Sequence, residues 1–222
     1  MPTVLITGAS RGIGAEFVRQ YAEAGWRVLA SARDPGRVAA GGAVSAHRLD
    51  VTSDENATAL AAELRGIAID LLINNAGVIG RRGDGLTTFD PTVLEETFSV
   101  NVTGPLRVTR ALLPNLLAGG RKTCVFLSSR MGSISLTPAG SLTYRVSKAA
   151  LNMAVRNIAQ ELKAEGVTAV AVHPGWVRTD MGGPGADLGV EQSVSGLRQV
   201  IEGLTPAMTG SFLNHDGSPI PW

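Results

Sequence analysis

The chain has a single cysteine and three histidines among 222 residues. One thiol, Cys124, cannot form an internal disulfide, and no histidine or cysteine cluster has the spacing of a metal site. We therefore expect a reducing compartment and no bound metal. An excess of one charge is also missing, because 20 basic and 19 acidic residues leave a net charge of +1. Such a chain has no field to hold a polyanion, so we expect no nucleic acid partner.

Long apolar runs are missing too. Runs such as residues 67–73 fall far short of the roughly 20 residues that cross a bilayer, and no charged N-terminal region precedes an apolar stretch. We expect a cytoplasmic protein without membrane contact. Hydrophobic residues make up 44% of the chain and charged residues 18%, which suits one large core in a folded protein. The length predicts a single domain over residues 1–222.

Short β-rich segments alternate with longer helical patterns along the chain. This alternation predicts an α/β fold, a doubly wound parallel sheet of seven strands with helices on both faces. The expected strands are residues 3–6, 27–31, 44–49, 71–73, 123–127, 168–172 and 211–213. The expected helices are residues 12–24, 53–64, 91–118, 143–165 and 190–201, the third interrupted near Pro105. Functional residues should follow the strands, at their carboxyl ends.

Three glycines stand where the first strand becomes a helix, in Thr7-Gly-Ala-Ser-Arg-Gly-Ile-Gly14. Gly8 permits a tight turn, Gly12 lets backbone N–H groups approach phosphate oxygens, and Gly14 lets the helix pack closely on the sheet. The turn predicts a dinucleotide pyrophosphate site at the helix N-terminus. An ordinary strand-to-helix turn is the alternative. The predicted binding residues here are Gly8, Ser10, Arg11, Gly12, Ile13 and Gly14.

The end of the second strand indicates which dinucleotide fits. An acidic residue there would hydrogen-bond the ribose 2′-OH of NAD, but Ser31-Ala-Arg33 offers none. Arg33 and Arg37, with Arg11, have the guanidinium groups that suit a 2′-phosphate. We therefore expect NADP, with NAD as the alternative. The arginines could equally be solvated surface charges, and Asp34 weakens the local field.

Polar residues also follow three later strands. Asp50 could accept a hydrogen bond from an adenine amine, or could cap the next helix beside Thr52 and Ser53. Asn74-Asn-Ala-Gly77 could border a cofactor or merely close its strand. A hydroxyl of Ser128-Ser129 could hold a carbonyl oxygen at the same sheet edge as the glycine turn.

Tyr144 and Lys148 stand four residues apart in a predicted helix, which places them on one face. An ammonium near a phenol favours the phenolate, so we expect Lys148 to lower the pKa of Tyr144 from its usual ~10 and make it a general acid or base. A surface contact between the two side chains is the alternative. Asn101 could bridge to Lys148 through water. No serine, histidine and aspartate form a hydrolase triad.

In their order and spacing, these motifs resemble the short-chain dehydrogenase/reductase family across nearly the whole chain. The segments that carry the resemblance are Thr7–Gly14, Asp50-Val51, Asn74–Gly77, Asn101, Ser128-Ser129-x-x-Gly132, Tyr144-x-x-x-Lys148 and Pro174–Thr179. Within the family, His173–Gly183 and Asn214–Trp222 look like the C-factor-like or sniffer-type carbonyl reductases. The resemblance implies a Rossmann-type fold.

The resemblance also implies residue roles. Tyr144 would donate a proton, Lys148 would lower its pKa and hold the nicotinamide ribose, Ser129 would steady the substrate oxygen, with Ser128 as fallback, and Asn101 would complete a proton relay. Arg33 and Arg37 match the two arginines of NADP-preferring members. The implied cofactor-binding residues beyond the glycine turn are Arg33, Arg37, Asp50, Val51, Asn75, Ala76, Gly77, Tyr144, Lys148, Pro174, Gly175, Val177 and Thr179.

The expected reaction is the NADPH-dependent reduction of a ketone or aldehyde, with a small carbonyl or alcohol compound as substrate. The alternatives are NAD-dependent oxidation of a secondary alcohol and a signalling protein that binds a dinucleotide. Residues 180–189 are expected to form a lid that orders on binding, or a disordered surface loop. Met131, Ile134, Trp176 and Met181 would line an apolar pocket or belong to the core. A stripe from Leu151 to Leu162 could pair subunits into a homodimer or homotetramer, or face the sheet in a monomer.

Overall fold

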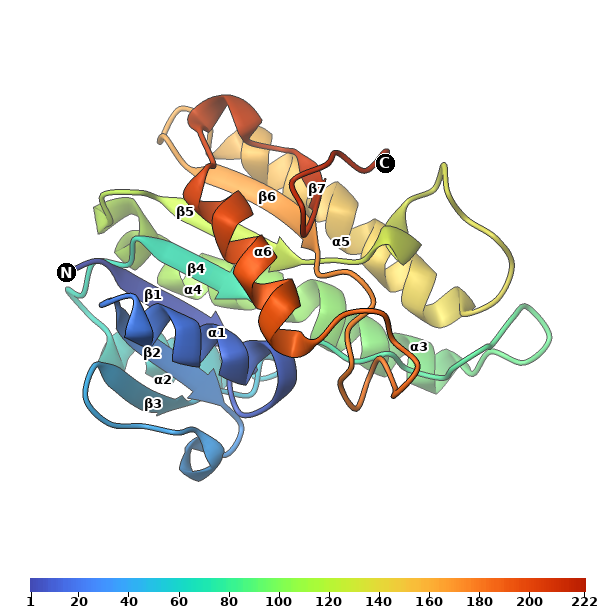
Figure 1. Cartoon of the computed structure of the whole chain (residues 1–222), viewed down its shortest axis with the longest axis horizontal. Coiled ribbons are helices and arrows are strands. Elements are labelled where there is room, and N and C mark those ends of the chain that lie inside the picture. The colour runs from blue at the N-terminus through green and yellow to red at the C-terminus, as the bar shows by residue number, and fades with distance from the viewer.

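The computed structural model describes residues 1–222 and has one sheet of seven parallel strands (Figure 1). The strands are β1 (Thr3–Thr7), β2 (Arg27–Ala32), β3 (Val44–Arg48), β4 (Leu71–Asn74), β5 (Thr123–Leu127), β6 (Thr168–His173) and β7 (Phe212–Asn214). Their order across the sheet is β3-β2-β1-β4-β5-β6-β7. The chain therefore builds outward from β1 in one direction and then in the other, which confirms the predicted doubly wound fold.

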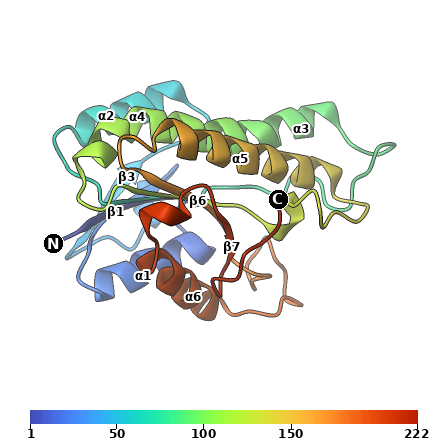
Figure 2. The same cartoon turned by 90° about the horizontal axis from the view of Figure 1, so that it is seen from above.

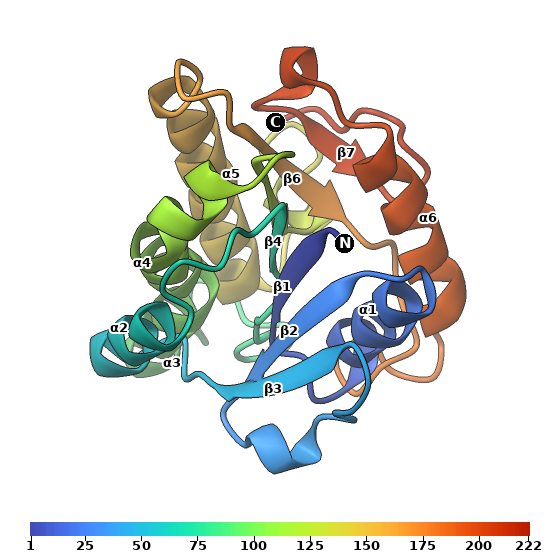
Figure 3. The same cartoon turned by 90° about the vertical axis from the view of Figure 1, so that its left-hand side faces the viewer.

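Helices cover both faces of the sheet, as Figure 2 shows. They are α1 (Gly12–Glu23), α2 (Asp54–Glu63), α3 (Pro91–Phe98), α4 (Gly104–Ala118), α5 (Leu142–Glu161) and α6 (Val190–Glu202). α1 and α6 lie on one face, and the other four lie on the opposite face (Figures 2 and 3). Alternate residues of β1 enter the two cores, since Leu5 belongs to one apolar cluster and Val4 and Ile6 to the other. Burial on both faces explains why the strands read as continuous apolar runs.

The helix predicted over residues 91–118 is divided in three. α3 and α4 are separated by a π-helical segment, η2 (Ser99–Thr103), just before Pro105. The predicted interruption is therefore present, but it takes the form of a widened turn that contains Asn101. The apolar stripe of α5 faces the sheet, because Leu151 and Val155 lie in its core. That face is not free to pair subunits.

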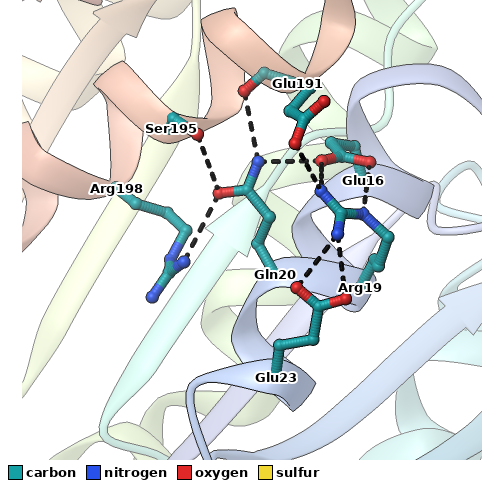
Figure 4. Close-up of polar contacts among 7 residues, drawn as sticks. All are labelled: Glu16, Arg19, Gln20, Glu23, Glu191, Ser195 and Arg198. Carbon is teal, nitrogen blue, oxygen red and sulfur yellow. Dashed lines mark hydrogen bonds and ion pairs between the residues drawn. The ribbon is translucent and has the colours of Figure 1, made fainter.

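A polar network joins α1 to α6 (Figure 4). The buried Gln20 donates from Nε2 to the carboxylate of Glu16 (2.8 Å) and to the backbone oxygen of Glu191 (3.2 Å), and its Oε1 accepts from Ser195 and Arg198. These contacts fix the start of α6, which directly follows the irregular segment 178–189. No helix of the chain has both the length and the apolar character needed to cross a bilayer.

Candidate active site

The glycine turn after β1 leaves no room for side chains. Gly8 and Gly12 have φ values of +67° and +55°, a region that glycine adopts without strain. A Cβ on Gly14 would lie 2.2 Å from the oxygen of Gly8, and a Cβ on Gly8 would lie 2.9 Å from the Cα of Ala76. The turn leads into α1, whose first N–H groups have no partner within the helix and no side-chain cap. The cradle exposes backbone instead of side chains, which suits a dinucleotide diphosphate, and binding there stays a prediction.

Asn75 ties the end of β4 to this cradle. Its Nδ2 donates to the backbone oxygens of Thr7 (2.8 Å) and Gly8 (3.2 Å), while its own N–H donates to the hydroxyl of Thr7 (3.0 Å). The segment Asn75–Gly77 is thereby held against the glycine turn. Its contact with a cofactor ribose stays a prediction.

Two arginines stand beside the end of β2 without an acidic partner. Arg33 and Arg37 are exposed, and neither has a carboxylate within the 4.0 Å of an ion pair. Asp34 forms no ion pair with either arginine, and its carboxylate accepts from the N–H of Gly36 (3.1 Å). Arg11 differs, since it forms a 2.7 Å ion pair with Asp180. Arg33 and Arg37 therefore offer two free guanidinium groups to a phosphate.

Asp50 follows β3 but does not cap α2. Its Oδ1 accepts from the N–H (2.9 Å) and the hydroxyl (2.7 Å) of Thr52, and these bonds lower the pKa of the carboxyl, with a further contribution from the charge of Arg33. The cap is Ser53, whose hydroxyl accepts from the N–H of Asn56 (3.1 Å). The capping alternative is wrong for Asp50. The next residue, Val51, is buried.

Tyr144 and Lys148 lie on one face of α5 and are both buried, with exposed fractions of 8% and 5%. The Lys148 ammonium donates to the backbone oxygen of Leu127 (2.8 Å) at the end of β5 and lies 5.7 Å from the centre of the Tyr144 ring. Ser129, two residues beyond Leu127, begins the short turn η3 (Arg130–Gly132). The structure therefore brings the predicted phenol, ammonium and hydroxyl together.

The predicted lowering of the phenol pKa is wrong for this arrangement. Burial raises the pKa of Tyr144 to about 12, and hydrogen bonding with Ser129 only partly opposes it. Burial also lowers the pKa of Lys148 to about 8. In a low-dielectric site, removing each group from water outweighs its attraction to a neighbour several ångströms away. At neutral pH Tyr144 is therefore a neutral phenol that can donate a proton.

Asn101 is fully buried in the π-helical segment η2. Its Oδ1 accepts from the N–H of Val78 (2.9 Å), and its Nδ2 donates to the backbone oxygen of Val78 (2.8 Å) and to the hydroxyl of Ser147 (3.1 Å). A Cβ on Gly77 would lie 3.4 Å from the Asn101 Oδ1 and 3.7 Å from the Lys148 Nζ. Both side chains thus border the segment that Asn75 holds against the cradle. The predicted water bridge between them stays a prediction.

The sequence reasoning missed Asn152. The hydroxyl of Ser128 donates to its Oδ1 (2.5 Å), and its Nδ2 donates to the backbone oxygen of Gly132 (3.2 Å). Asn152 therefore contacts Ser128, which precedes Ser129, and Gly132, which follows it. Ser128, the fallback for holding a substrate oxygen, is engaged in this contact. The available signal was spacing, because Asn152 stands one further helical turn after Lys148 on the same face.

The segment after β6 closes on itself. Pro174 accepts from the hydroxyl of Ser193 (2.6 Å), Gly175 has a φ of +82°, and Val177 bridges to Leu188. Thr179 reaches the cradle, where its methyl group would lie 3.5 Å from a Cβ on Gly12. The segment after β6 thus contacts both α6 and the cradle. Ordering on binding stays a prediction.

Three further arginine contacts hold residues 178–189. Arg178 donates to the backbone oxygens of Ala186 (2.9 Å) and Asp187 (3.0 Å) within the segment, and Arg82 donates to that of Met181 (2.5 Å) from the loop after β4. The contact of Arg82 and the ion pair between Arg11 and Asp180 tie the segment to the loop after β4 and to the glycine turn. Of the expected pocket residues, Ile134 and Trp176 are 77% and 53% exposed, so they do not belong to the core.

The model of the short chain dehydrogenase family matches residues 2–187. Among curated proteins, C-signal of Myxococcus xanthus is 48% identical over 155 residues, which cover 69% of this chain and 93% of that protein. Among solved structures, the carbonyl reductase Sniffer of D. melanogaster has a TM-score of 0.94 at 28% identity and covers 100% of both chains. The NADPH-bound carbonyl reductase from chicken fatty liver has a TM-score of 0.89 at 33% identity, covering 100% of this chain and 99% of that one.

Proposed function

The chain belongs to the short-chain dehydrogenase family, and from that membership we propose that it reduces a ketone or aldehyde to an alcohol with NADPH. The proposal is supported by a continuous path of contacts across the site. The glycine turn packs on Ala76, and the adjoining Gly77 borders Asn101 and Lys148. A dinucleotide laid along this path from the cradle would bring its reactive ring to the catalytic face of α5.

Residues of this chain fit such a cofactor. The cradle of Gly8, Gly12 and Gly14 would hold the diphosphate through backbone N–H groups, because any Cβ there would fill the space or meet other atoms. Arg33 and Arg37, which have no acidic partner, would hold a 2′-phosphate. NADPH, when bound, supplies the hydride for the carbonyl carbon.

Side chains of α5 and of the turn that begins at Ser129 would then supply the proton that completes the reduction. Tyr144, a neutral phenol at pH 7, donates its proton to the oxygen that becomes an alkoxide. The hydroxyl of Ser129 hydrogen-bonds the same oxygen and aligns it. Lys148, with a pKa of about 8, is charged at pH 7 and stabilises the negative charge left on Tyr144. Asn101 completes a relay that restores the proton from water.

The observation that carries the proposal is the buried Tyr144 between Ser129 and Lys148. We test it with Tyr144→Phe, which should keep NADPH affinity within about twofold and lose about 10²- to 10⁴-fold in turnover, the usual contribution of a positioned acid. The matched control is Tyr21→Phe, since Tyr21 is the other tyrosine of the chain and is also buried, against Phe17 and Trp26. Unchanged turnover in Tyr144→Phe would remove Tyr144 from the mechanism.

The same site could run in the opposite direction, as oxidation of a secondary alcohol with NAD. Turnover measured with NADPH and with NADH separates the two, and faster turnover with NADH would reverse the proposed cofactor preference. A signalling role is the second candidate, favoured by the 48% identity to C-signal. Tight NADPH binding without its oxidation over a broad panel of carbonyl compounds would support that role against the enzyme.

A further inference from the structure

The catalytic helix α5 begins without a cap of its own. The residue at its N-cap is Ser141, which has a φ of +56° and whose side chain caps no N–H group. A non-glycine residue in this left-handed region is strained unless its surroundings hold it. The first N–H groups of a helix have no partner within the helix. The start of α5 therefore depends on groups from elsewhere in the chain.

Asp84 supplies those groups from the loop after β4. Its carboxylate accepts from the N–H of Thr143 (3.2 Å to the nearer oxygen) and from the Thr143 hydroxyl, and its backbone oxygen accepts from the N–H of Leu142 (3.2 Å). These are the first two residues of α5. One residue, 58 positions before the helix, thus performs the capping that a serine or aspartate normally performs at the N-cap.

The carboxylate of Asp84 has no cationic partner. Its exposed fraction is 1%, and no lysine, arginine or histidine forms an ion pair with it. A buried charge of this kind is costly unless it is well hydrogen-bonded. Here the Thr143 donors and the partial positive charge at the N-terminus of α5 stabilise it. The same attraction fixes the first turn of the helix against the loop.

The loop that contains Asp84 packs closely against α3 and the start of α5. A Cβ on Gly80 would lie 2.6 Å from the hydroxyl of Thr97 in α3 and 3.1 Å from the methyl group of Thr143. Two residues before Asp84, Arg82 reaches the backbone oxygen of Met181 beyond β6. The segment from Gly80 to Asp84 therefore contacts both the start of α5 and the segment 178–189.

We propose that Asp84 is a positioning residue for Tyr144. Thr143 directly precedes Tyr144, so the contact that fixes Thr143 also fixes the direction in which the phenol leaves the helix toward Ser129. Asp84 itself touches neither substrate nor cofactor. The inference rests on the proposed function, because it concerns the residue that would donate the proton.

The test compares Asp84→Ala with Asp90→Ala. Asp90 is the N-cap of α3, where its carboxylate accepts from the N–H of Thr92 (2.9 Å), so it matches Asp84 in chemistry but caps another helix. We expect Asp84→Ala to lower kcat by about 10- to 100-fold, because small displacements of a reacting group cost that much. KM for NADPH should stay within about twofold, since the cradle makes no contact with Asp84. Asp90→Ala should change kcat by less than about twofold.

Two milder variants cover the case in which Asp84→Ala does not fold. Asp84→Asn keeps an accepting oxygen in the same place, and Thr143→Val keeps the helix N–H but removes the hydroxyl. Each should lower kcat less than Asp84→Ala, again with KM for NADPH unchanged. Equal kcat in wild type and all Asp84 variants that fold would overturn the proposal, as would an equal loss of kcat in Asp90→Ala.

The two proposals fail in different ways. If the wild-type protein does not oxidise NADPH with any carbonyl compound, the proposed function fails before Asp84 is tested. If wild type turns over and loses its activity in Tyr144→Phe but not in Asp84→Ala, the function stands and the positioning role is rejected.

Discussion

Replacing Lys148 with methionine should stabilise the folded protein while abolishing turnover. Burial lowers the pKa of Lys148 from 10.5 to about 8, and at about 1.36 kcal/mol per pKa unit this difference destabilises the charged folded state by about 3 kcal/mol. The substitution also removes the hydrogen bond from the ammonium to Leu127, a loss of about 1 kcal/mol. At pH 7 we therefore expect Lys148→Met to be more stable than wild type by about 2 kcal/mol.

The sign of this difference depends on pH. Below pH 8 the lysine is charged in both the folded and the unfolded chain, so wild type bears the full cost of burying the charge. Between pH 8 and 10.5 the folded protein loses the proton while the unfolded chain keeps it, so the stability of wild type rises relative to the variant. Above pH 10.5 only the lost hydrogen bond remains, and wild type becomes the more stable.

Urea unfolding followed by tryptophan fluorescence measures this difference, without added cofactor, at pH 7 and pH 9.5. Every other titratable residue is the same in both proteins, so the comparison isolates the lysine. A variant less stable than wild type at pH 7, or a difference that does not change with pH, would show that the Lys148 ammonium is not desolvated as the structure indicates.

Three further substitutions probe the arginines beside β2 and the short turn η3. Arg33→Ala and Arg37→Ala should each weaken NADPH binding about tenfold or more and leave NADH binding unchanged, as measured by fluorescence titration. Arg65→Ala, at another exposed arginine, is the control. Equal losses of affinity for both cofactors, or a similar loss of NADPH affinity in the control, would contradict a 2′-phosphate site. Gly132→Ala should lower stability by about 1–3 kcal/mol and kcat with it, because the new Cβ would lie 2.7 Å from a backbone carbon of α5. Gly85→Ala, where a Cβ meets nothing within 4 Å, is its control, and equal behaviour of the two variants would refute the packing argument.

The fold was largely predictable because its signals are local. Seven apolar segments separated by helical patterns gave the strands, and the observed order confirms the doubly wound sheet. The face shared by Tyr144 and Lys148 follows from helical periodicity alone. The glycine turn could also be located, since its residues are adjacent in sequence and its conformation excludes side chains.

The remaining features depend on contacts between distant residues. Asp84 caps α5 from 58 positions earlier in the chain. Asn152 contacts the residues around Ser129 from 20 or more positions later. No periodic pattern in the sequence indicates either contact. The raised pKa of Tyr144 was missed for the same reason. Burial, which dominates that pKa, depends on the packed protein, whereas the spacing to Lys148 shows only the attraction.

The residues proposed to bind the dinucleotide and those proposed to handle the proton come from two successive parts of the chain. The cradle, the arginines beside β2 and the segment at Gly77 all come from the first 77 residues, whereas Asn101, Ser129, Tyr144 and Lys148 come later. The two lengths meet where Gly77 borders the lysine and the asparagine. We therefore expect an exchange of the arginines in the first part to alter the choice of dinucleotide while the residues of the later part that handle the proton stay in place, provided that Gly77 is kept where the two lengths meet.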